Sequence, residues 1–316
     1  MKLRVTDLDN ALSFYGHGKL LISAEYFVLD GALALAVPTK FGQTLRVRQL
    51  HSSESTLYWV ALNNKKQAWL NLVFDTTDFS CLNAQTPEAS RLSKMLNEAR
   101  LLNPSFLTDK KDYAVETALQ FPNEWGLGSS STLIHCLAQW AGVDAHLLLQ
   151  QTIGGSGYDV ACAGHNTAIL YQIQNGKPVT MKANWRPPFA ADIYFAYTGK
   201  KQLSSEGIHH YRNVLADKTH GVKELSRITE RLLKTETLDN LEELLNEHEN
   251  IVGAQLKMMK VKDTLFPDYW GSVKSLGAWG GDFVLMTNTK GKEELSAYLQ
   301  TKQIDTLFSW DELLLT

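Results

Sequence analysis

The residues best suited to chemistry in this chain form a short loop rich in glycine and serine. The loop reads Trp125-Gly126-Leu127-Gly128-Ser129-Ser130-Ser131-Thr132 and lies between an expected strand and an expected helix. Glycines let backbone amides approach an anion, and the helix N-terminus adds aligned N–H groups equivalent to roughly +0.5 charge. Serine hydroxyls in the first helical turn offer oxygen ligands to the magnesium that a nucleotide carries. The same residues also fit a plain glycine turn with serine N-caps, so the loop alone leaves both interpretations open.

Two familiar phosphate-binding patterns are absent from this loop. No Lys-Ser or Lys-Thr pair follows a glycine at Walker A spacing, and the dinucleotide pattern Gly-x-Gly-x-x-Gly is not present in it. A phosphate-binding loop of another lineage is the interpretation that remains.

Four stretches of the chain together resemble the GHMP kinases, the family of galactokinase and of the homoserine, mevalonate and phosphomevalonate kinases. They follow the order of that family and span nearly the whole chain. The first motif is Gly16-His17-Gly18-Lys19-Leu20-Leu21-Ile22, continued by Ala24-Glu25-Tyr26 and Leu29-Asp30-Gly31; the second is residues 122–131; the segment of the catalytic aspartate is Gly155-Ser156-Gly157-Tyr158-Asp159-Val160-Ala161; and the C-terminal glycine loop is Gly277-Ala278-Trp279-Gly280-Gly281-Asp282.

The resemblance implies phosphoryl transfer from ATP to a small molecule. Asp159 would be the general base that accepts the proton of the attacking hydroxyl. Lys19 would lower the pKa of that hydroxyl or steady the transferring phosphate. Taken alone, Lys19 also fits a surface lysine at a strand edge, and Asp159 also fits a helix cap.

The resemblance also implies a nucleotide site with bound Mg²⁺. One of Ser129 and Ser130 would be the magnesium ligand. Gly280 and Gly281 would close over the nucleotide from the second domain, although a tight turn between strands is the alternative for them. The residues implied to bind ATP are Gly126, Leu127, Gly128, Ser129, Ser130, Ser131, Gly280 and Gly281.

Departures from the family pattern affect the metal and the acceptor. Many members carry a glutamate upstream of the catalytic aspartate as a second magnesium ligand, where this chain has Gln150 and Gln151; Asp144 is the only acid between Ser131 and Asp159. We therefore expect serine and phosphate oxygens to hold the metal. Trp279 replaces a glycine, and its indole could narrow the nucleotide or acceptor pocket.

Within the family, the chain looks most similar to the mevalonate and phosphomevalonate kinases of isoprenoid precursor synthesis. Glu124-Trp125 stands where phosphomevalonate kinases often have a lysine, which argues against a phosphorylated acceptor because an anionic substrate gains from nearby cations. Two alternatives are a diphosphomevalonate decarboxylase-like enzyme, against which Lys19 counts, and a nucleotide-binding regulator without catalysis. Retention of both Lys19 and Asp159 argues against the regulator.

The composition is that of an ordinary globular protein. The chain has 316 residues, 44% hydrophobic and 21% charged, with a formal net charge of −3. At ~100–200 residues per domain we expect about two domains. The charge predicts no nucleic-acid partner, and the absence of an apolar run of ~18 residues predicts no membrane span.

The cysteines and the N-terminus indicate where the protein works. Cys81, Cys136 and Cys162 are odd in number and far apart, which predicts reduced thiols. The first nine residues lack the apolar stretch of a signal peptide. We expect a cytoplasmic protein, monomeric or homodimeric, that acts on a small molecule.

Strands and segregated helices alternate along the chain, which predicts an α+β fold. The resemblance implies a ribosomal protein S5 domain 2-like ATP-binding domain at residues 1–184 and a ferredoxin-like domain at residues 185–316. The paired prolines of residues 185–188 predict an extended linker between them. The charged face of residues 237–249 is expected to be solvated. Strands are expected at residues 20–22, 33–37, 44–48, 57–61, 68–73, 113–119, 193–197 and, around a loop, within 273–287; helices are expected from Pro87 to about 102, after the glycine–serine loop, and at residues 205–215, 222–233, 238–259 and 292–299.

Overall fold

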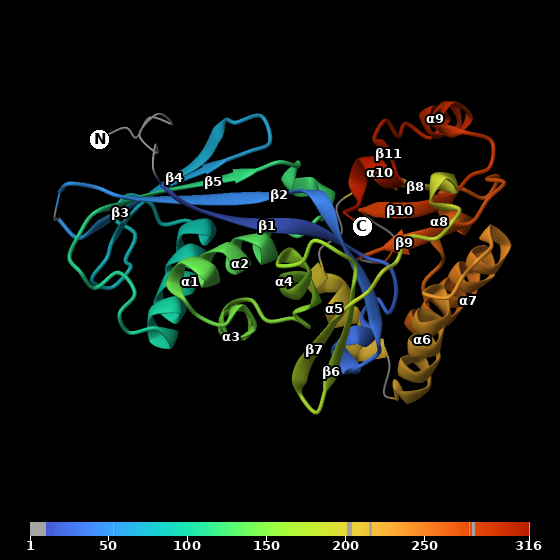
Figure 1. Ribbon diagram of the computed structural model, residues 1–316, viewed down its shortest axis with the longest axis horizontal. Helices are drawn as coiled ribbons and strands as arrows, with labels where there is room; N and C mark the ends of the chain where they lie inside the picture. The colour runs from blue at the N-terminus through green and yellow to red at the C-terminus, as the bar shows by residue number, and fades with distance from the viewer. Residues whose placement is uncertain are drawn as a thin grey trace. The chain divides into compact units, whose positions relative to one another are not determined.

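The computed structural model describes residues 11–52, 54–200, 204–214, 217–277, 279 and 282–315 (Figure 1). Gly280 and Gly281, expected to close over a nucleotide, lie outside the described residues. The fold is mixed α+β with a larger and a smaller sheet, as predicted. Within the described residues, no helix combines the length and the apolar character needed to cross a bilayer.

The chain forms two compact units, each made of several separate stretches of the sequence. Unit 1 comprises residues 1–18, 41–123 and 128–164, and unit 2 comprises residues 19–40, 124–127 and 165–316. The chain therefore passes from one unit to the other within strand β1 (Leu12–Leu21), within strand β2 (Ala34–Gln49) and within the glycine–serine loop. The family domain boundary near residue 184 stays a prediction.

Unit 1 is a sheet covered by helices. Its strands run in the order β4 (Ala68–Asp75), β3 (Thr56–Leu62), β5 (Tyr113–Leu119) and the second half of β2, with only the β3–β5 pair parallel. Four helices lie on one side of this sheet (Figure 1). They are α1 (Pro87–Leu102), α2 (Ser129–Ala141), α3 (Ala145–Thr152) and α4 (Tyr158–Ala163).

Helix α1 shows why the sequence folds this way. Thr86 caps its N-terminus by accepting the N–H of Ala89, and Pro87 occupies the first turn, where its missing N–H costs nothing. Leu92, Met95 and Leu96 recur at the helical spacing and are buried against the sheet.

Unit 2 contains the smaller sheet, which has the topology predicted for the C-terminal domain. Strands β8 (Ile193–Tyr197), β9 (Val273–Leu276), β10 (Phe283–Thr287) and β11 (Leu307–Ser309) are all antiparallel in the order β11-β8-β10-β9. With helices after β8 and α9 (Lys292–Thr301) after β10, this is the ferredoxin-like β-α-β-β-α-β arrangement. The name expected for the N-terminal domain stays a prediction.

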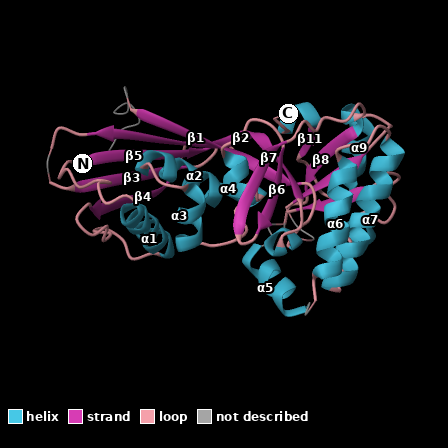
Figure 2. Ribbon diagram, turned by 60° about the horizontal axis from the view of Figure 1, so that its bottom comes forward, coloured by secondary structure: helices cyan, strands magenta, loops and turns pink. Residues whose placement is uncertain are grey.

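The helices between β8 and β9 complete unit 2. Helices α6 (Thr219–Leu232) and α7 (Leu238–Leu256) run side by side, as Figures 1 and 2 both show. A hairpin of β6 (Ile169–Gln174) and β7 (Lys177–Lys182) pairs with the first half of β2. The remaining elements of this unit are α5 (Ser204–Val214), α8 (Val261–Leu265), α10 (Trp310–Leu313) and the 3-10 turn η2 (Phe27–Asp30).

Two predictions about the chain's course are wrong. The strands expected at 33–37 and 44–48 are one strand, β2, because β6 pairs with its first half and β5 with its second half, so the backbone stays extended through Pro38 and Gly42. The linker expected at residues 185–188 is packed instead. Trp185 is 3% exposed, with its ring 5.0 Å from that of Trp310.

Candidate active site

The glycine–serine loop has the geometry of an anion-binding helix N-terminus. Gly126 and Gly128 have φ of +68° and +91°, a region that favours glycine. Helix α2 begins at Ser129, and its first hydrogen bond runs from the N–H of Thr132 to the carbonyl of Gly128 (2.9 Å). The N–H groups of residues 129–131 therefore have no intrahelical acceptor and are placed to bind an anion.

The three serines of the loop have different surroundings. Ser129 is half-buried and donates its hydroxyl proton to Oδ1 of Asn123 (2.6 Å), whereas Ser130 is exposed. Ser131 is buried and donates to the carbonyl of Gly128 (2.9 Å). Because the proton of Ser129 is directed to Asn123, the lone pairs of its Oγ are left for a cation. Serine oxygens fit Mg²⁺, which takes oxygen ligands and keeps several waters.

The first motif packs directly on this helix. A Cβ built on Gly16 would lie 3.1 Å from the carbonyl oxygen of Thr132 and 3.2 Å from its Cα. Strand β1 therefore approaches the first turn of α2 more closely than most side chains allow. This contact explains a glycine at position 16 within a strand.

Lys19 lies at the loop and not at the surface. The residue is 8% exposed, and its ammonium donates to the carbonyl of Gly126 at 2.8 Å. Its backbone N–H donates to the carbonyl of Leu127 at 3.0 Å. The lysine of the first motif is thus bonded twice to the second motif, which excludes the interpretation as a surface lysine.

Asp282 of the C-terminal motif touches the same loop. A Cβ on Gly126 would lie 2.1 Å from Oδ2 of Asp282, so the carboxylate occupies the space of a side chain at residue 126. Asp282 is buried and has φ of +47°. Its backbone is held by Thr198 and Lys200, which bond its carbonyl and its N–H at 2.8 Å each. No role for this aspartate was predicted from the sequence.

Asp159 lies in the first turn of helix α4, in unit 1. It follows Gly155 and Gly157, which have φ of +106° and +87°, and it is partly exposed. Its Oδ1 accepts the N–H of Val160 at 2.9 Å, which leaves the second oxygen for another partner. Helix α4 packs against α2, and a Cβ on Gly164 at its end would lie 2.8 Å from the ring of His135.

The predicted site residues fall in both units. Unit 2 brings Lys19, Gly126 and Leu127 together, and unit 1 holds residues 128–131 and Asp159. Two polar or sulfur side chains of α2 serve packing: Cys136 is fully buried, and His135 packs on Gly164.

The comparisons with known proteins find similar structures. No model of a protein family and no curated protein sequence matches the chain. The galactokinase of Lactococcus lactis complexed with galactose matches with a TM-score of 0.71 at 14% identity, covering 98% of this chain and 95% of that chain. The phosphomevalonate kinase of Streptococcus pneumoniae, in complex with phosphomevalonate and AMPPNP, matches at 0.69 and 14%, covering 94% and 99%. The mevalonate kinase of Methanococcus jannaschii matches at 0.66 and 14%, covering 97% and 99%.

The chain has the fold of the GHMP kinases. The resemblance carried by the four motifs is therefore confirmed at the level of the fold. The contacts between motifs agree with this fold. Gly16 and Lys19 of the first motif and Asp282 of the C-terminal motif each contact the glycine–serine loop, which is the second motif.

Gln150 and Asp144, which lie before Asp159 in the sequence, both form hydrogen bonds with backbone groups. Gln150 donates its side-chain N–H to the carbonyl of Gly155 (2.9 Å) and so supports the loop before Asp159. Asp144 caps helix α3 by accepting the N–H groups of His146 and Leu147. Within the described residues, no group of three or more His, Cys, Asp or Glu side chains could hold a metal ion. That serine and phosphate oxygens hold a metal stays a prediction.

Trp279, which replaces a glycine of the GHMP kinase pattern, is packed inside unit 2. The residue is 3% exposed, and its Nε1 donates to the carbonyl of Met259 at 3.0 Å. Its ring lies beside Gly253, whose added Cβ would be 3.5 Å from Cζ2. The indole therefore fills the interior of unit 2, and its effect on a ligand pocket stays a prediction.

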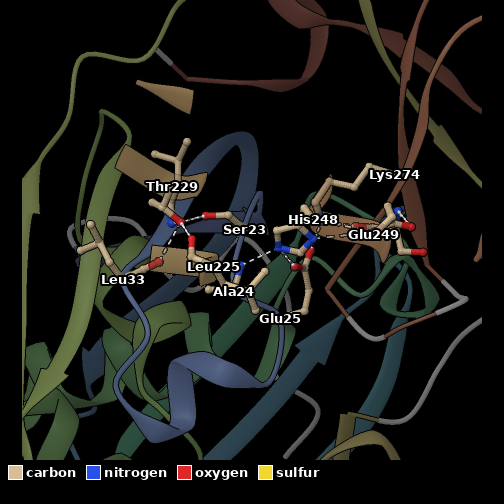
Figure 3. A network of polar contacts seen from close by, with 11 residues as sticks. Ser23, Ala24, Glu25, Leu33, Leu225, Thr229, His248, Glu249 and Lys274 are labelled. Atoms are coloured by element: carbon tan, nitrogen blue, oxygen red, sulfur yellow. Dashed lines mark hydrogen bonds and ion pairs between the residues drawn. The ribbon is translucent and has the colours of Figure 1, made fainter. Parts of the chain in front are cut away.

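A buried cluster of ionisable residues lies beside the first motif of this GHMP kinase fold (Figure 3). Glu25, His248 and Lys274 are 0% exposed and Glu249 is 1% exposed. Lys274 Nζ pairs with Glu25 Oε1 and lies 3.8 Å from Glu249 Oε1, and His248 Nε2 lies 3.0 Å from Glu25 Oε2. The charged face of residues 237–249 was expected to be solvated. This expectation is wrong for His248 and Glu249, which lie on α7 and are buried in this cluster.

The charges in the cluster are set by burial and pairing. Burial opposes ionisation of Glu25, but Lys274 and His248 outweigh it and lower its pKa to about 2. Burial raises the pKa of Glu249 to about 8, with Lys274 opposing the rise, and burial lowers the pKa of His248. At neutral pH, Glu25 therefore carries the negative charge opposite Lys274, and Glu249 keeps its proton. One feature of the sequence could have indicated this cluster: Lys274 lies within a short strand of otherwise uncharged residues, and a buried lysine needs a partner of opposite charge.

Proposed function

We propose that this protein is an ATP-dependent small-molecule kinase. The observation that carries the proposal is the bond from the buried ammonium of Lys19 to the carbonyl of Gly126, two residues before the N-cap of α2. A lysine buried at a phosphate loop costs solvation energy that an anionic ligand returns.

In this proposal, a specific residue or group of residues performs each task that phosphoryl transfer requires. The N–H groups at the start of α2 bind phosphate oxygens, and Lys19 stabilises the charge that develops during transfer. Ser129 is the protein ligand of Mg²⁺, which neutralises the phosphates when ATP is bound. Asp159 accepts the proton of the acceptor hydroxyl. Gly280 and Gly281 keep their expected place over the nucleotide as part of the proposal.

We propose mevalonate as the first acceptor to test and phosphomevalonate as the second. Glu124, exposed just before the loop, disfavours an acceptor that already carries a phosphate. The similar structures have AMPPNP and phosphomevalonate in one case and galactose in another, which supports ATP as donor and a hydroxyl as acceptor.

We place the enzyme in the cytoplasm, as a monomer or homodimer. Cys81, Cys136 and Cys162 all lie in the described part of the chain, and no disulfide joins them. Reduced thiols are the usual state of cytoplasmic cysteines.

The test is an ADP-release assay with Mg²⁺ over mevalonate, phosphomevalonate, homoserine and galactose. We expect turnover with one acceptor and its loss in Lys19→Met. A wild type that binds ATP but releases no ADP with any acceptor would contradict the kinase and favour a nucleotide-binding regulator. A wild type that does not bind ATP would contradict both.

A further inference from the structure

The turn that follows β1 has a backbone that its residues do not prefer. Ala24 and Tyr26, on either side of Glu25, have φ of +66° and +61°. Residues with a Cβ rarely adopt this region, and they stay there only where the surroundings hold them. All three side chains are buried.

Three elements of unit 2 hold this turn, one at each residue; Figure 3 shows the contacts of Ala24 and Glu25. The N–H of Ala24 donates to Nε2 of His248 on α7 at 2.9 Å. The carboxylate of Glu25 pairs with Lys274 on β9. The hydroxyl of Tyr26 accepts the N–H of Trp279, in the loop after β9, at 2.8 Å. The turn is thus tied to the strand and the loop that carry the C-terminal motif.

Both sides of this connection reach Gly126. On one side, Lys19 lies five residues before Ala24 in the sequence and bonds the carbonyl of Gly126. On the other side, β9 pairs at Leu276 with Asp282, whose carboxylate packs on Gly126. A shift of the turn relative to β9 would therefore move two contacts of the phosphate loop.

The charges of the cluster favour a geometric role over a role in stability. Taking Glu25 and Lys274 out of water is costly, and a buried ion pair is often no more stabilising than apolar residues of similar size. What the pair does supply is direction, because an ammonium and a carboxylate bond only at a narrow range of distances and angles.

We propose that the Glu25–Lys274 ion pair positions the phosphate loop, by fixing the 24–26 turn against β9 and so placing Lys19 and Asp282 at Gly126. Glu25 and Lys274 are positioning residues: they act through Lys19, Tyr26 and Asp282. This inference rests on the proposed function for its consequence in ATP binding, but the placement of the loop can be measured without it.

The test compares the double variant Glu25→Gln/Lys274→Met with the wild type. Either single substitution leaves a buried charge unpaired and is expected to impair folding, whereas the double variant removes both charges. Two readouts are made beside thermal unfolding: titration with a fluorescent ATP analogue in the presence of Mg²⁺, and hydrogen exchange of the amides of residues 126–131. We expect the double variant to fold, to bind the analogue about tenfold more weakly and to exchange these amides about tenfold faster.

Two further variants make the result specific. Tyr26→Phe removes only the hydroxyl that accepts the N–H of Trp279, and we expect it to weaken binding and speed exchange in the same direction. Ser23→Ala is the matched control. Ser23 bonds Thr229 (Figure 3) and accepts the N–H of Leu35 in the same buried region, and these bonds do not involve β9 or the glycine–serine loop. It is expected to lose stability and to keep both readouts.

The outcomes separate the two proposals. If the wild type does not bind the analogue, the proposed function fails, and the exchange of residues 126–131 still decides the positioning role. Unchanged exchange in a folded double variant, or in Tyr26→Phe should the double variant not fold, overturns the inference. Faster exchange in Ser23→Ala to the same extent would also overturn it, because the effect would then follow stability alone.

Discussion

The ammonium of Lys19 lies 2.8 Å from the carbonyl oxygen of Gly126, and the carboxylate of Asp282 occupies the space where a side chain of residue 126 would stand. A cation and an anion from opposite ends of the sequence thus meet at one glycine. Any larger residue at position 126 would displace Asp282, and φ of +68° would strain it as well.

Substituting Lys19 by Met should slow catalysis without unfolding the protein. The methionine keeps most of the apolar stem in the buried site, but it removes a donor aimed at developing charge. Loss of such a donor typically costs about 10²–10³ in turnover. ADP release and thermal unfolding are to be measured together, with Lys65→Met, an exposed lysine between β3 and β4, as control. Near wild-type turnover in Lys19→Met would exclude the proposed role.

Substituting Asp159 by Asn should abolish turnover and leave ATP affinity nearly intact. The base acts on the acceptor and not on the nucleotide, and its loss is expected to cost roughly 10²–10⁴-fold. Steady-state kinetics and titration with an ATP analogue separate the two effects. Asp144→Asn is the control, since Asp144 caps α3. If both variants lose only stability, Asp159 is a cap as well.

Substituting Ser129 and Ser130 singly by Ala should give different results. Ser129 directs its proton to Asn123 and keeps lone pairs for the metal, so Ser129→Ala should raise the Mg²⁺ concentration needed for half-maximal activity. Ser130 is exposed, and Ser130→Ala should cost no more than a lost cap, about 1 kcal/mol. Binding of Mn²⁺ with ATP, followed by electron paramagnetic resonance, gives a readout independent of turnover. Equal, negligible effects would show that neither hydroxyl binds the metal.

Glu249 should make the protein less stable as the pH rises from about 6.5 to about 8. Its pKa is 4.5 when exposed and about 8 in the folded state, mainly because of burial. In this range the folded protein keeps a proton that the unfolded chain has lost, so the free energy of unfolding falls by up to about 1.4 kcal/mol per pH unit. Burial lowers the pKa of His248, so the titration of His248 changes the free energy of unfolding only below about pH 6.5.

Chemical denaturation of Glu249→Gln at pH 6.5, 7.25 and 8 tests this dependence. The amide stays neutral, so the slope should flatten relative to the wild type. Glu243→Gln, an exposed substitution on the same helix, should keep the wild-type slope. A wild type whose stability does not change over this range would show that Glu249 is ionised in the fold, opposite Lys274.

The sequence by itself determined the elements whose signals are local. The helix from Pro87 and the strand at residues 113–119 are where caps and apolar spacing predicted them. The phosphate loop was also readable, because positive φ at Gly126 and Gly128 and a helix starting at Ser129 depend on neighbours in the chain. The order of the four motifs predicted a fold that the comparisons confirm.

Only the tertiary structure decided which charges are buried and what they pair with. Glu25 and Lys274 are 249 residues apart in sequence, and a lysine in a strand or a glutamate on a helix looks the same whether it faces water or a partner. The contact of Asp282 with Gly126 is equally invisible, because a glycine shows that space is needed but not what fills it. The single strand β2 was missed for the same reason, since its pairing with β5 and β6 overrides the local signal of Pro38 and Gly42. Long-range pairing leaves no local trace, and it is this pairing that places Lys19 at the phosphate loop.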